Sequence, residues 1–394
     1  MLRAVKIRFY PNKSQKHLLF QHFGAVRFIY NYMLDEKLRD YNLGLQTSIY
    51  DLKKLLPQMK KNEKFSWLKD IDSQALGESV LDIDRAFKNF FRELKKGNKK
   101  GFPKFHSKHN SRQSFQYPQR VKINEDKNKI YLPKIGWVKA KIHRDITIIK
   151  TVTVSVEANY FHASVLTEFQ DIAESDNNET IGIDMGVTRF ATLSNDSYIK
   201  PINFTKDLKR LKLLQKQLSD KQHSRFKGDK TPQSNNYKKL KLKVQKKHLK
   251  ISNKRKDFLH KESQKMSKYK TVIVEALKIK NMSKSSKGDR ETPGKNVKQK
   301  SGLNRSILQQ SWGKFFEMLN YKLNQNGNQL IKVDPKYTSQ KCPECGTIDS
   351  KNRESQSVFI CKSCNHSGNA DYIASINIKA RGIHDLSMPI IKSA

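Results

Sequence analysis

Thr180-Ile181-Gly182-Ile183-Asp184-Met185-Gly186-Val187 is a short apolar stretch in which an acid stands two residues before Gly186. The stretch predicts a β-strand, and residues 191–196 predict a second strand that closes in a turn. An RNase H-type sheet begins in this way, with the acid on its central strand. Acids near glycine are also common in turns, so this stretch alone leaves Asp184 open between a turn residue and a catalytic acid.

Two further carboxylates stand at the ends of predicted elements. The apolar stretch Thr271-Val272-Ile273-Val274-Glu275 predicts a strand that ends on Glu275, and Asp371 opens a predicted helix with a buried face of small residues. Phosphodiester hydrolysis needs an activated water and neutralisation of the leaving oxygen. Two magnesium ions about 3.5 to 4 Å apart supply both when converging carboxylates hold them. Asp184, Glu275 and Asp371 are therefore the predicted catalytic and magnesium-binding residues.

The four cysteines form two close pairs, Cys342-Pro343-Glu344-Cys345 and Cys361-Lys362-Ser363-Cys364. Two such pairs about 15 to 20 residues apart bring four thiolates within reach of one tetrahedral zinc ion. Two disulfides are the alternative, but the sequence shows no signal-peptide core that would indicate an oxidising compartment. Four thiolates close the coordination shell, so we expect one structural zinc and another ion for any catalysis.

The chain is strongly basic. Its 394 residues include 78 Lys and Arg against 37 Asp and Glu, a formal net charge of +41. A charge of this size destabilises a compact fold by self-repulsion unless a polyanion neutralises it, so nucleic acid is the expected partner. An anionic membrane is the alternative, but the sequence has no long apolar stretch and its basic segments do not form one amphipathic tail. We expect no membrane association and a prokaryotic cytoplasmic, nucleoid-associated location.

The N-terminal half predicts strands with helices inserted between them. The first ten residues alternate like a strand, and two later segments have helical apolar spacing, residues 14–41 and residues 73–94, with Gly97 as a stop. Short strands follow at residues 129–132, 137–142 and 151–156. The simplest architecture is a small β barrel of residues 1–11 and 111–173 that holds a helical domain of residues 12–110. The polar run 174–179 is a predicted linker.

The C-terminal half contains a lysine-rich stretch from Lys206 to Lys270. Its leucine spacing predicts two basic helices joined by the polar segment 228–236. Such helices form either a solvated hairpin or a phosphate-binding surface, and the charge density favours the second interpretation. The predicted organisation is multidomain α+β: an RNase H-like domain of residues 179–338 and 368–382, an inserted zinc ribbon of residues 339–367 and a tail of residues 383–394.

These motifs together resemble one family. Gly182-Ile183-Asp184-Met185-Gly186, the strand ending at Glu275, and the cysteine pairs leading into Asn369-Ala370-Asp371-Tyr372-Ile373-Ala374-Ser375-Ile376-Asn377-Ile378 are similar to the three RuvC motifs and the zinc ribbon of TnpB. Members of this family are RNA-guided DNA nucleases encoded by insertion sequences and related to compact type V CRISPR effectors. The N-terminal half also resembles the family, in Tyr10-Pro11-Asn12, in residues 23–31 and 85–91, and in Leu132-Pro133-Lys134-Ile135-Gly136-Trp137-Val138.

The resemblance implies a wedge-type barrel that holds a guide-RNA scaffold, a helical recognition domain, and a RuvC-like nuclease domain that cuts double-stranded DNA beside a short target-adjacent motif. It carries the metal-binding role to Asp184, Glu275 and Asp371, and the zinc-ligand role to the four cysteines. Two positions depart from the family, which often has Asn where this chain has Ile373 and an additional Asp where it has Asn369.

The resemblance also implies that the target-adjacent motif is read between the recognition helices and the barrel. Amide, hydroxyl and cationic groups suited to base edges stand there, and two aromatic rings could stack on nucleotides or fill the core instead. These candidate nucleic-acid contacts are Gln74, Arg112, Gln113, Ser114, Phe115 and Tyr117. A polar loop with a buried aromatic is the alternative interpretation of this segment.

The leading hypothesis is a monomeric, magnesium-dependent, RNA-guided DNA endonuclease, in which pairing with the guide supplies sequence specificity. Three alternatives use the same motifs. The first is an RNA-guided DNA-binding repressor with a silent nuclease, and the second is a compact type V CRISPR effector. The third is a transposase that joins DNA ends at an RNase H-type site.

Overall fold

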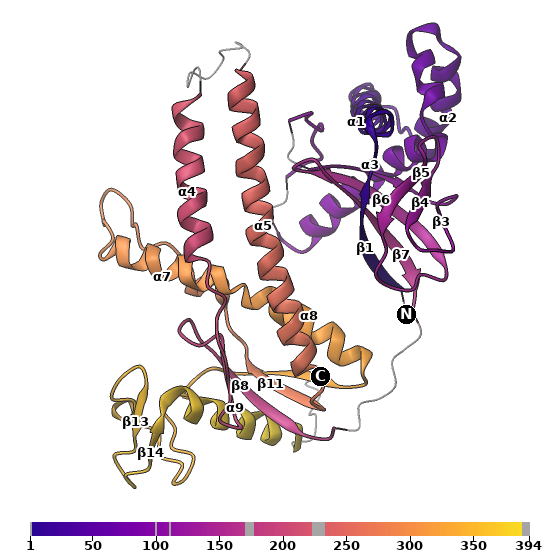
Figure 1. Ribbon diagram of the computed structural model, residues 1–394. Helices are drawn as coiled ribbons and strands as arrows, with labels where there is room; N and C mark the ends of the chain where they lie inside the picture. The colour runs from indigo at the N-terminus through magenta and orange to yellow at the C-terminus, as the bar shows by residue number, and fades with distance from the viewer. Residues whose placement is uncertain (1, 99–100, 110–111, 170–176, 223–232, 388–394) are drawn as a thin grey trace. The chain divides into compact units, whose positions relative to one another are not determined.

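The computed structural model describes residues 2–98, 101–109, 112–169, 177–222 and 233–387. The chain divides into two compact units, Met1–Gln170 and Asp171–Ala394 (Figure 1). The predicted linker lies partly outside the described residues, as do the polar segment 228–236 and the predicted tail, of which residues 383–387 continue the last helix. No helix among the described ranges is both long enough and apolar enough to cross a bilayer.

The first unit is built on a seven-stranded antiparallel sheet with the order β2-β6-β7-β1-β5-β4-β3. The predicted first strand pairs with β7 and β5 in the middle of this sheet. The predicted strands at 129–132, 137–142 and 151–156 are confirmed as β4, β5 and β6 within one or two residues. The strand bounds are β1 Leu2–Tyr10, β2 Arg112–Tyr117, β3 Lys122–Ile123, β4 Lys129–Leu132, β5 Gly136–Lys141, β6 Ile149–Glu157 and β7 Tyr160–Glu168.

The sheet is open between its two edges, whereas the sequence predicted a small β barrel. The strands β2 and β3 are its two edges, and no ladder joins them among the described residues. The helices α1 (Lys13–Asn42) and α3 (Ser73–Lys95) pack against β2, the strand that would have to pair with β3 to close the barrel. The helices and the sheet share one hydrophobic core, so residues 12–110 do not form a separately packed body.

The helices of the first unit begin and end where their caps require. The Asn12 side chain accepts the N–H of Gln15 at the start of α1, and the Asp72 carboxylate accepts the N–H groups of Gln74 and Ala75 at the start of α3. Gly97, at φ +71°, ends α3 as predicted. Two elements between them were not predicted, α2 (Ile49–Lys61) and the 3₁₀ helix η1 (Glu63–Asp70).

The second unit contains a five-stranded mixed sheet with the order β10-β9-β8-β11-β12. The strands β8, β11 and β12 are parallel, whereas β9 pairs antiparallel to β8 and β10 pairs antiparallel to β9. The strand that carries Asp184 is β8, which is central, as the sequence predicted. The strand bounds are β8 Thr180–Met185, β9 Ala191–Leu193, β10 Tyr198–Ile199, β11 Thr271–Glu275 and β12 Gln329–Val333.

Helices cover both faces of this sheet. Side chains of one face, such as Ile183 on β8 and Val274 on β11, form a core with the helices α5 (Asn235–Met266) and α8 (Trp312–Gln325). On the other face, Ile273 of β11 packs with Ile378 of α9 (Ala370–Ser387). Along β8 and β11, successive side chains therefore point alternately to the two helical layers.

Two glycines allow α9 to lie very close to the sheet. A Cβ at Gly182 of β8 would stand 2.3 Å from the carbonyl oxygen of Ser375, and a Cβ at Gly382 of α9 would stand 2.5 Å from the side chain of Ile273. Real Cβ atoms do not approach backbone oxygens so closely. The absence of a side chain at Gly182 therefore sets the distance between β8 and α9.

The two predicted basic helices are α4 (Thr205–Asp220) and α5, which lie side by side (Figure 1). Asp207 joins them, because its two carboxylate oxygens lie 2.5 and 2.6 Å from the ammonium groups of Lys247 and Lys254. These ion pairs lower the pKa of Asp207 to about 2. Most other lysines of the hairpin remain in solvent.

The remaining short elements follow β11 or belong to the cysteine-rich segment. After β11 come α6 (Ile279–Met282) and α7 (Val297–Gln310). The cysteine-rich segment holds the 3₁₀ helix η2 (Ser350–Asn352) and a two-stranded sheet of β13 (Val358–Ile360) and β14 (Ser367–Asn369). The chain then enters α9 directly.

We expect Gly182→Ala to destabilise the second unit, because the added Cβ forces β8 and α9 apart. The expected loss is about 1–3 kcal/mol, the usual cost of overpacking, seen as a lower melting temperature in calorimetry. Gly302→Ala in α7 is the control, since a Cβ there meets no heavy atom within 4 Å. An unchanged melting temperature for Gly182→Ala would show that the sheet and helix have room for a side chain.

Candidate functional site

The three predicted carboxylates come together on the α9 face of the second sheet. In the parallel pairing of β8 with β11, Ile183 stands opposite Val274, so Asp184 and Glu275 follow at the same edge. Residues two apart in a strand point to the same face of a sheet. Asp184 therefore shares the face of Gly182, and Glu275 shares the face of Ile273, and α9 covers this face. Asp371 lies in the first turn of α9. One edge of one face therefore carries all three acids.

The electrostatics of this edge show that the carboxylates act on one another. Burial, then the negative charges of Glu275 and Asp371, raise the pKa of Asp184 to about 7. Burial also raises the pKa of Glu275, against the hydrogen bond that it accepts from the Thr338 hydroxyl at 2.6 Å. The raised pKa values mean that ionised carboxylates at this edge destabilise the folded protein. A bound cation would neutralise them, so the site favours the binding of cations.

Arg353 is a member of the site that the sequence did not predict. Its Nη2 atom lies 3.4 Å from Oδ1 of Asp371 and donates to the carbonyl of Gln356 at 2.9 Å. The guanidinium charge opposes the rise in pKa of both Asp184 and Glu275. The sequence offered no local signal, because Arg353 stands between the cysteine pairs and reaches the acids only when that segment folds.

Thr338 was also missed, and it connects two of the elements that hold the acids. Its hydroxyl donates to Glu275 at the end of β11, and its carbonyl accepts from Nδ2 of Asn377 on α9 at 2.9 Å. The same amide nitrogen donates to the carbonyl of Lys341 at 2.7 Å. The segment leading into the cysteine pairs is therefore bonded to both β11 and α9.

The carboxylate edge fits hard divalent cations, because its ligands are all oxygen atoms. Across the ranges that the structure describes, the cysteines form the only group of three or more His, Cys, Asp or Glu residues whose ligand atoms all lie within 4.8 Å of one another. The three carboxylates are therefore spread more widely than the ligands of a single ion. Such a spread suits two ions about 3.5 to 4 Å apart.

The four cysteines fit one tetrahedral ion. None is in a disulfide, and the Sγ atoms of Cys342 and Cys364 lie 3.6 Å apart, those of Cys345 and Cys361 3.5 Å apart. Zn–S bonds of about 2.3 Å in a tetrahedron place sulfur atoms about 3.8 Å apart, close to these distances. The structure therefore has one cluster of four free thiols instead of the two disulfides that were the alternative.

The two cysteine pairs have the same backbone turn. The N–H of Gly346 donates to the carbonyl of Cys342, and the N–H of Asn365 donates to the carbonyl of Cys361. Gly346 and Asn365 have positive φ, at +75° and +56°, which glycine and asparagine adopt most readily. Each turn directs two thiols to the same point.

The cysteine cluster packs directly on the start of α9. Cys342, Phe359 and Cys361 share a small hydrophobic core with Ala370 and Ile373, the residues on either side of Asp371 along the helix. The N–H of Ala370 also donates to the carbonyl of Ser357. The position of Asp371 therefore depends on the folding of the cysteine-rich segment.

The polar residues proposed for reading DNA lie in the first unit, and three of them meet. Arg112, Gln113 and Ser114 line a cavity of about 240 Å³ that also contacts α1 and α3. Oε1 of Gln113 accepts from Arg27 at 3.4 Å. Gln74 is not among the lining residues, although its Oε1 is buried and has no hydrogen-bond partner among the described residues.

The two aromatic candidates are core residues. Phe115 and Tyr117 are 4% and 0% exposed, and the Tyr117 hydroxyl donates to the carbonyl of Pro133 at 2.9 Å. Alternation along β2 turns both rings into the shared core, where His22 and Phe23 contact Phe115. The core-filling interpretation is therefore the correct one for this conformation, and these rings do not stack on a nucleotide in it.

The sequence matches three family profiles. They are described as "Probable transposase" over residues 151–286, "Cas12f1-like, TNB domain" over residues 312–378 and "Helix-turn-helix domain" over residues 1–45. The last range holds one strand followed by α1 and a short tail in this structure.

Two relatives match almost the whole chain. A protein of Escherichia coli (strain K12) named "Putative RNA-guided DNA endonuclease InsQ" is 38% identical over 97% of this chain and 92% of its own. A "Putative RNA-guided DNA endonuclease" of Streptomyces pristinaespiralis is 30% identical over 97% of this chain and 89% of its own. Among solved structures, a Cas12f1–sgRNA–target DNA complex has a TM-score of 0.52 at 14% identity, covering 96% of this chain and 98% of that one.

We expect the purified protein to contain about one zinc per chain and Cys342→Ser to lose it, because three thiolates do not complete the tetrahedral shell. The variant should also be less stable, and the start of α9 should exchange its amide hydrogens faster. Metal analysis and hydrogen exchange measure the two effects. Ser363→Ala, inside the second cysteine pair, is the control. Full zinc content in Cys342→Ser would contradict the four-thiolate site.

The raised pKa of Asp184 predicts a pH-dependent effect of Asp184→Asn on the metal-free protein. The unfolded chain loses this proton near pH 4 and the folded chain near pH 7, so the ionised acid destabilises the fold increasingly as pH rises through that window. The variant should therefore melt at a higher temperature than the unmodified protein at pH 8, with a free energy of unfolding larger by up to about 4 kcal/mol. Near pH 4 the two proteins should have nearly the same stability.

Melting curves from pH 4 to pH 8 with a chelator present test this prediction. Glu317→Gln, at an exposed position of α8, is the control for removing a negative charge from the same unit. A gain in stability for Asp184→Asn that is the same at every pH would contradict the proposed origin in the buried carboxylate.

Proposed function

Because the chain belongs to the TnpB family, we propose that it is an RNA-guided DNA endonuclease that cuts DNA next to a short target-adjacent motif. The observation that carries the proposal is the convergence of Asp184, Glu275 and Asp371 on one edge of the second sheet. Acids gathered at one point from three distant segments are costly for stability, so their arrangement points to chemistry.

We propose that the second unit is the nuclease. Its mixed sheet, with the acid of β8 on the central strand, supports a RuvC-like domain of residues 179–338 and 368–382. The four-cysteine segment, residues 339–367, would be its zinc ribbon. In the first unit, residues 1–11 and 111–173 would act as the wedge and residues 12–110 as the recognition domain, packed on one core.

The residues of the carboxylate edge have distinct roles in this proposal. Asp184, Glu275 and Asp371 would hold two magnesium ions, which supply an activated water and neutralise charge on the leaving oxygen when bound. Thr338 fixes the orientation of Glu275 through its hydroxyl. Arg353 would offer its guanidinium to the scissile phosphate, because its partner Asp371 would turn to a cation.

Nucleic acid is the proposed partner on both sides of the reaction, as guide RNA and as target double-stranded DNA. The charge of +41 and the lysine-rich pair of α4 and α5 support binding to polyanions. Guide pairing would supply sequence specificity. The proposed contacts to the target-adjacent motif are Gln74, Arg112, Gln113 and Ser114. Phe115 and Tyr117 are no longer included, because their rings are buried in the core. We propose a monomer that works on the prokaryotic nucleoid.

The test is cleavage by the protein purified with its co-expressed RNA. In magnesium, a matched DNA target should be cut and an unmatched target should not. Asp184→Ala should reduce the rate about a hundredfold or more while leaving DNA binding intact, because it removes a cation ligand at the centre of the edge. Glu317→Ala, on α8 away from the three acids, is the control and should cut normally.

Four outcomes would contradict the proposal or change it. Cleavage that survives Asp184→Ala would remove the carboxylate assignment. DNA that is bound but stays uncut in magnesium would favour the nuclease-silent repressor. Strand-transfer products formed without RNA would favour a transposase, the activity that the profile over residues 151–286 is named for. A repeat array beside the coding sequence, in place of transposon ends, would favour a CRISPR effector.

A further inference from the structure

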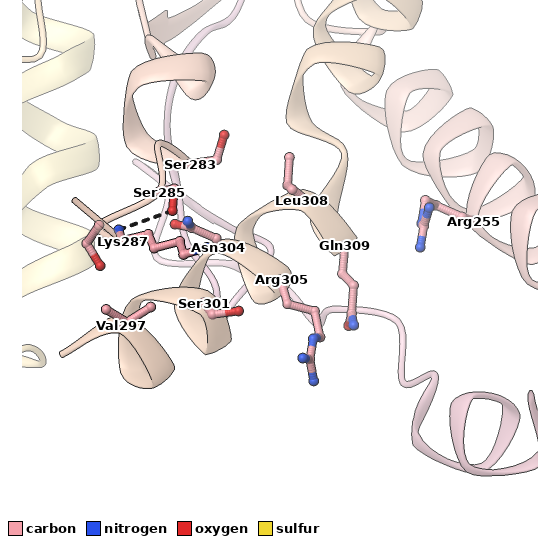
Figure 2. Close-up of a pocket in the computed structure, with 11 residues that line it drawn as sticks. Arg255, Ser283, Ser285, Lys287, Val297, Ser301, Asn304, Arg305, Leu308 and Gln309 are labelled. Carbon is pink, nitrogen blue, oxygen red and sulfur yellow. Dashed lines mark hydrogen bonds between the residues drawn. The ribbon is translucent and has the colours of Figure 1, made fainter. Parts of the chain in front are cut away.

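A cavity of about 650 Å³ lies in the second unit, next to the segment that follows β11. Figure 2 shows its lining side chains, which come from α5, from the stretch between α6 and α7, and from α7 itself. None of the three catalytic acids lines it. The lining residues are Arg255, Ser283, Ser285, Ser286, Lys287, Val297, Ser301, Asn304, Arg305, Leu308 and Gln309.

The charge of the cavity is entirely positive. Arg255, Lys287 and Arg305 line it, whereas no acidic residue does. None of the three has an ion pair within the described ranges. Burial alone lowers the pKa of Arg255, with no carboxylate opposing it, and the guanidinium lies 5.2 Å from the centre of the Phe204 ring, which holds it in place. A half-buried guanidinium without a counterion, with the exposed cations Lys287 and Arg305 beside it, indicates a site for an anion.

The hydrogen-bonding capacity of the cavity wall is incompletely used. In the described part of the chain, seven buried side-chain atoms have no hydrogen-bond partner, and three of them belong to this wall: Nε of Arg255, Oγ of Ser286 and Oδ1 of Asn304. Buried polar atoms without partners are rare because each loses its bonds to water. The three atoms are covered by protein, so small side-chain rotations would be needed to turn them to a ligand.

The kind of each group indicates the kind of ligand. Guanidinium, ammonium and hydroxyl groups donate to phosphate oxygens. The Asn304 amide already donates through Nδ2 to the carbonyl of Lys284 at 3.2 Å, which leaves Oδ1 as an acceptor. A ligand that suits both parts of the wall carries an anionic oxygen and, close to it, a hydroxyl that donates. A ribonucleotide in a strand has both, as its phosphodiester and its 2′-hydroxyl, whereas DNA lacks the hydroxyl.

We propose that this cavity binds one phosphodiester and the adjoining ribose 2′-hydroxyl of an RNA strand. Arg255 and Arg305 contact the phosphate from opposite sides, on α5 and α7, and Asn304 accepts the hydroxyl proton. The proposal rests on the RNA partner of the proposed function and adds a place where the protein distinguishes RNA from DNA. Because α7 follows β11 in the chain, a strand in the cavity also contacts the segment that leads away from Glu275.

The experiment measures equilibrium binding of the full-length protein, in a chelator, to a short single-stranded RNA and to DNA of the same sequence. Removing one cation that neutralises a phosphate of a single strand lowers the slope of log affinity against log salt by about 0.7. We expect Arg305→Gln and Arg255→Gln each to lower the slope by about this amount for RNA. Arg290→Gln, an exposed position on the same segment outside the cavity, is the matched control and should change it less.

The preference for RNA is tested with Asn304→Ala. This variant should weaken RNA binding about fivefold or more, the effect expected for one hydrogen bond to a hydroxyl, and leave DNA binding unchanged. Equal weakening of RNA and DNA binding would overturn the ribose contact. Slopes for Arg305→Gln and Arg255→Gln that equal the slope for Arg290→Gln would overturn the phosphate site.

Folding and activity are kept apart from this result. Arg255→Lys retains the charge and should restore the slope. If Arg255→Gln melts at a lower temperature, the exposed Arg305 alone decides the test. The binding experiment does not measure cleavage, so the two proposals fail in different assays. Failure of the nuclease proposal would appear as uncut DNA in the cleavage assay, whereas failure of the RNA site would appear here as unchanged salt slopes.

Discussion

The contact between α9 and the sheet of the second unit is the constraint on which the carboxylate edge depends. Gly182 leaves no Cβ between β8 and the carbonyl of Ser375, and Gly382 leaves none between α9 and Ile273. The helix therefore lies against two neighbouring parallel strands at once. Its first turn, with Asp371, then stands beside the ends of these strands, where Asp184 and Glu275 emerge. A wider spacing would separate the third acid from the other two.

Bringing three acids together has an electrostatic cost that the fold offsets in part. The raised pKa of Asp184 records that cost. Thr338 and Arg353 reduce it, by a hydrogen bond to Glu275 and an ion pair with Asp371. Both residues belong to the segment between β12 and α9, which includes the cysteine cluster. The cysteine-rich segment thus packs against the start of α9, where Asp371 lies, and also supplies positive charge to Asp371 through Arg353.

The sequence predicted the elements whose pattern is local and missed the features that depend on tertiary contacts. Alternation and helical spacing predicted β1, β6, α1 and α3. Acids at the ends of predicted elements singled out Asp184, Glu275 and Asp371, which the structure places at one edge. The cysteine spacing predicted a cluster for the same reason. Arg353 could not be predicted, because its partner lies across the folded ribbon. The open sheet could not be predicted either, because strand patterns do not show whether two edges meet.

The two departures from the family pattern show how neighbouring residues can support the start of α9, where Asp371 lies, without contributing a ligand. Oδ1 of Asn369 accepts the N–H groups of Asp371 and Tyr372, both at 3.2 Å, so this residue caps the first turn of α9. Ile373 is 2% exposed and packs with Cys342 and Cys361. Asn in its place would bury an amide among thiolates and apolar groups, at a cost in stability. In this chain Asn369 and Ile373 together fix where α9 begins. They thereby also fix the position of Asp371, which lies in the first turn of the helix.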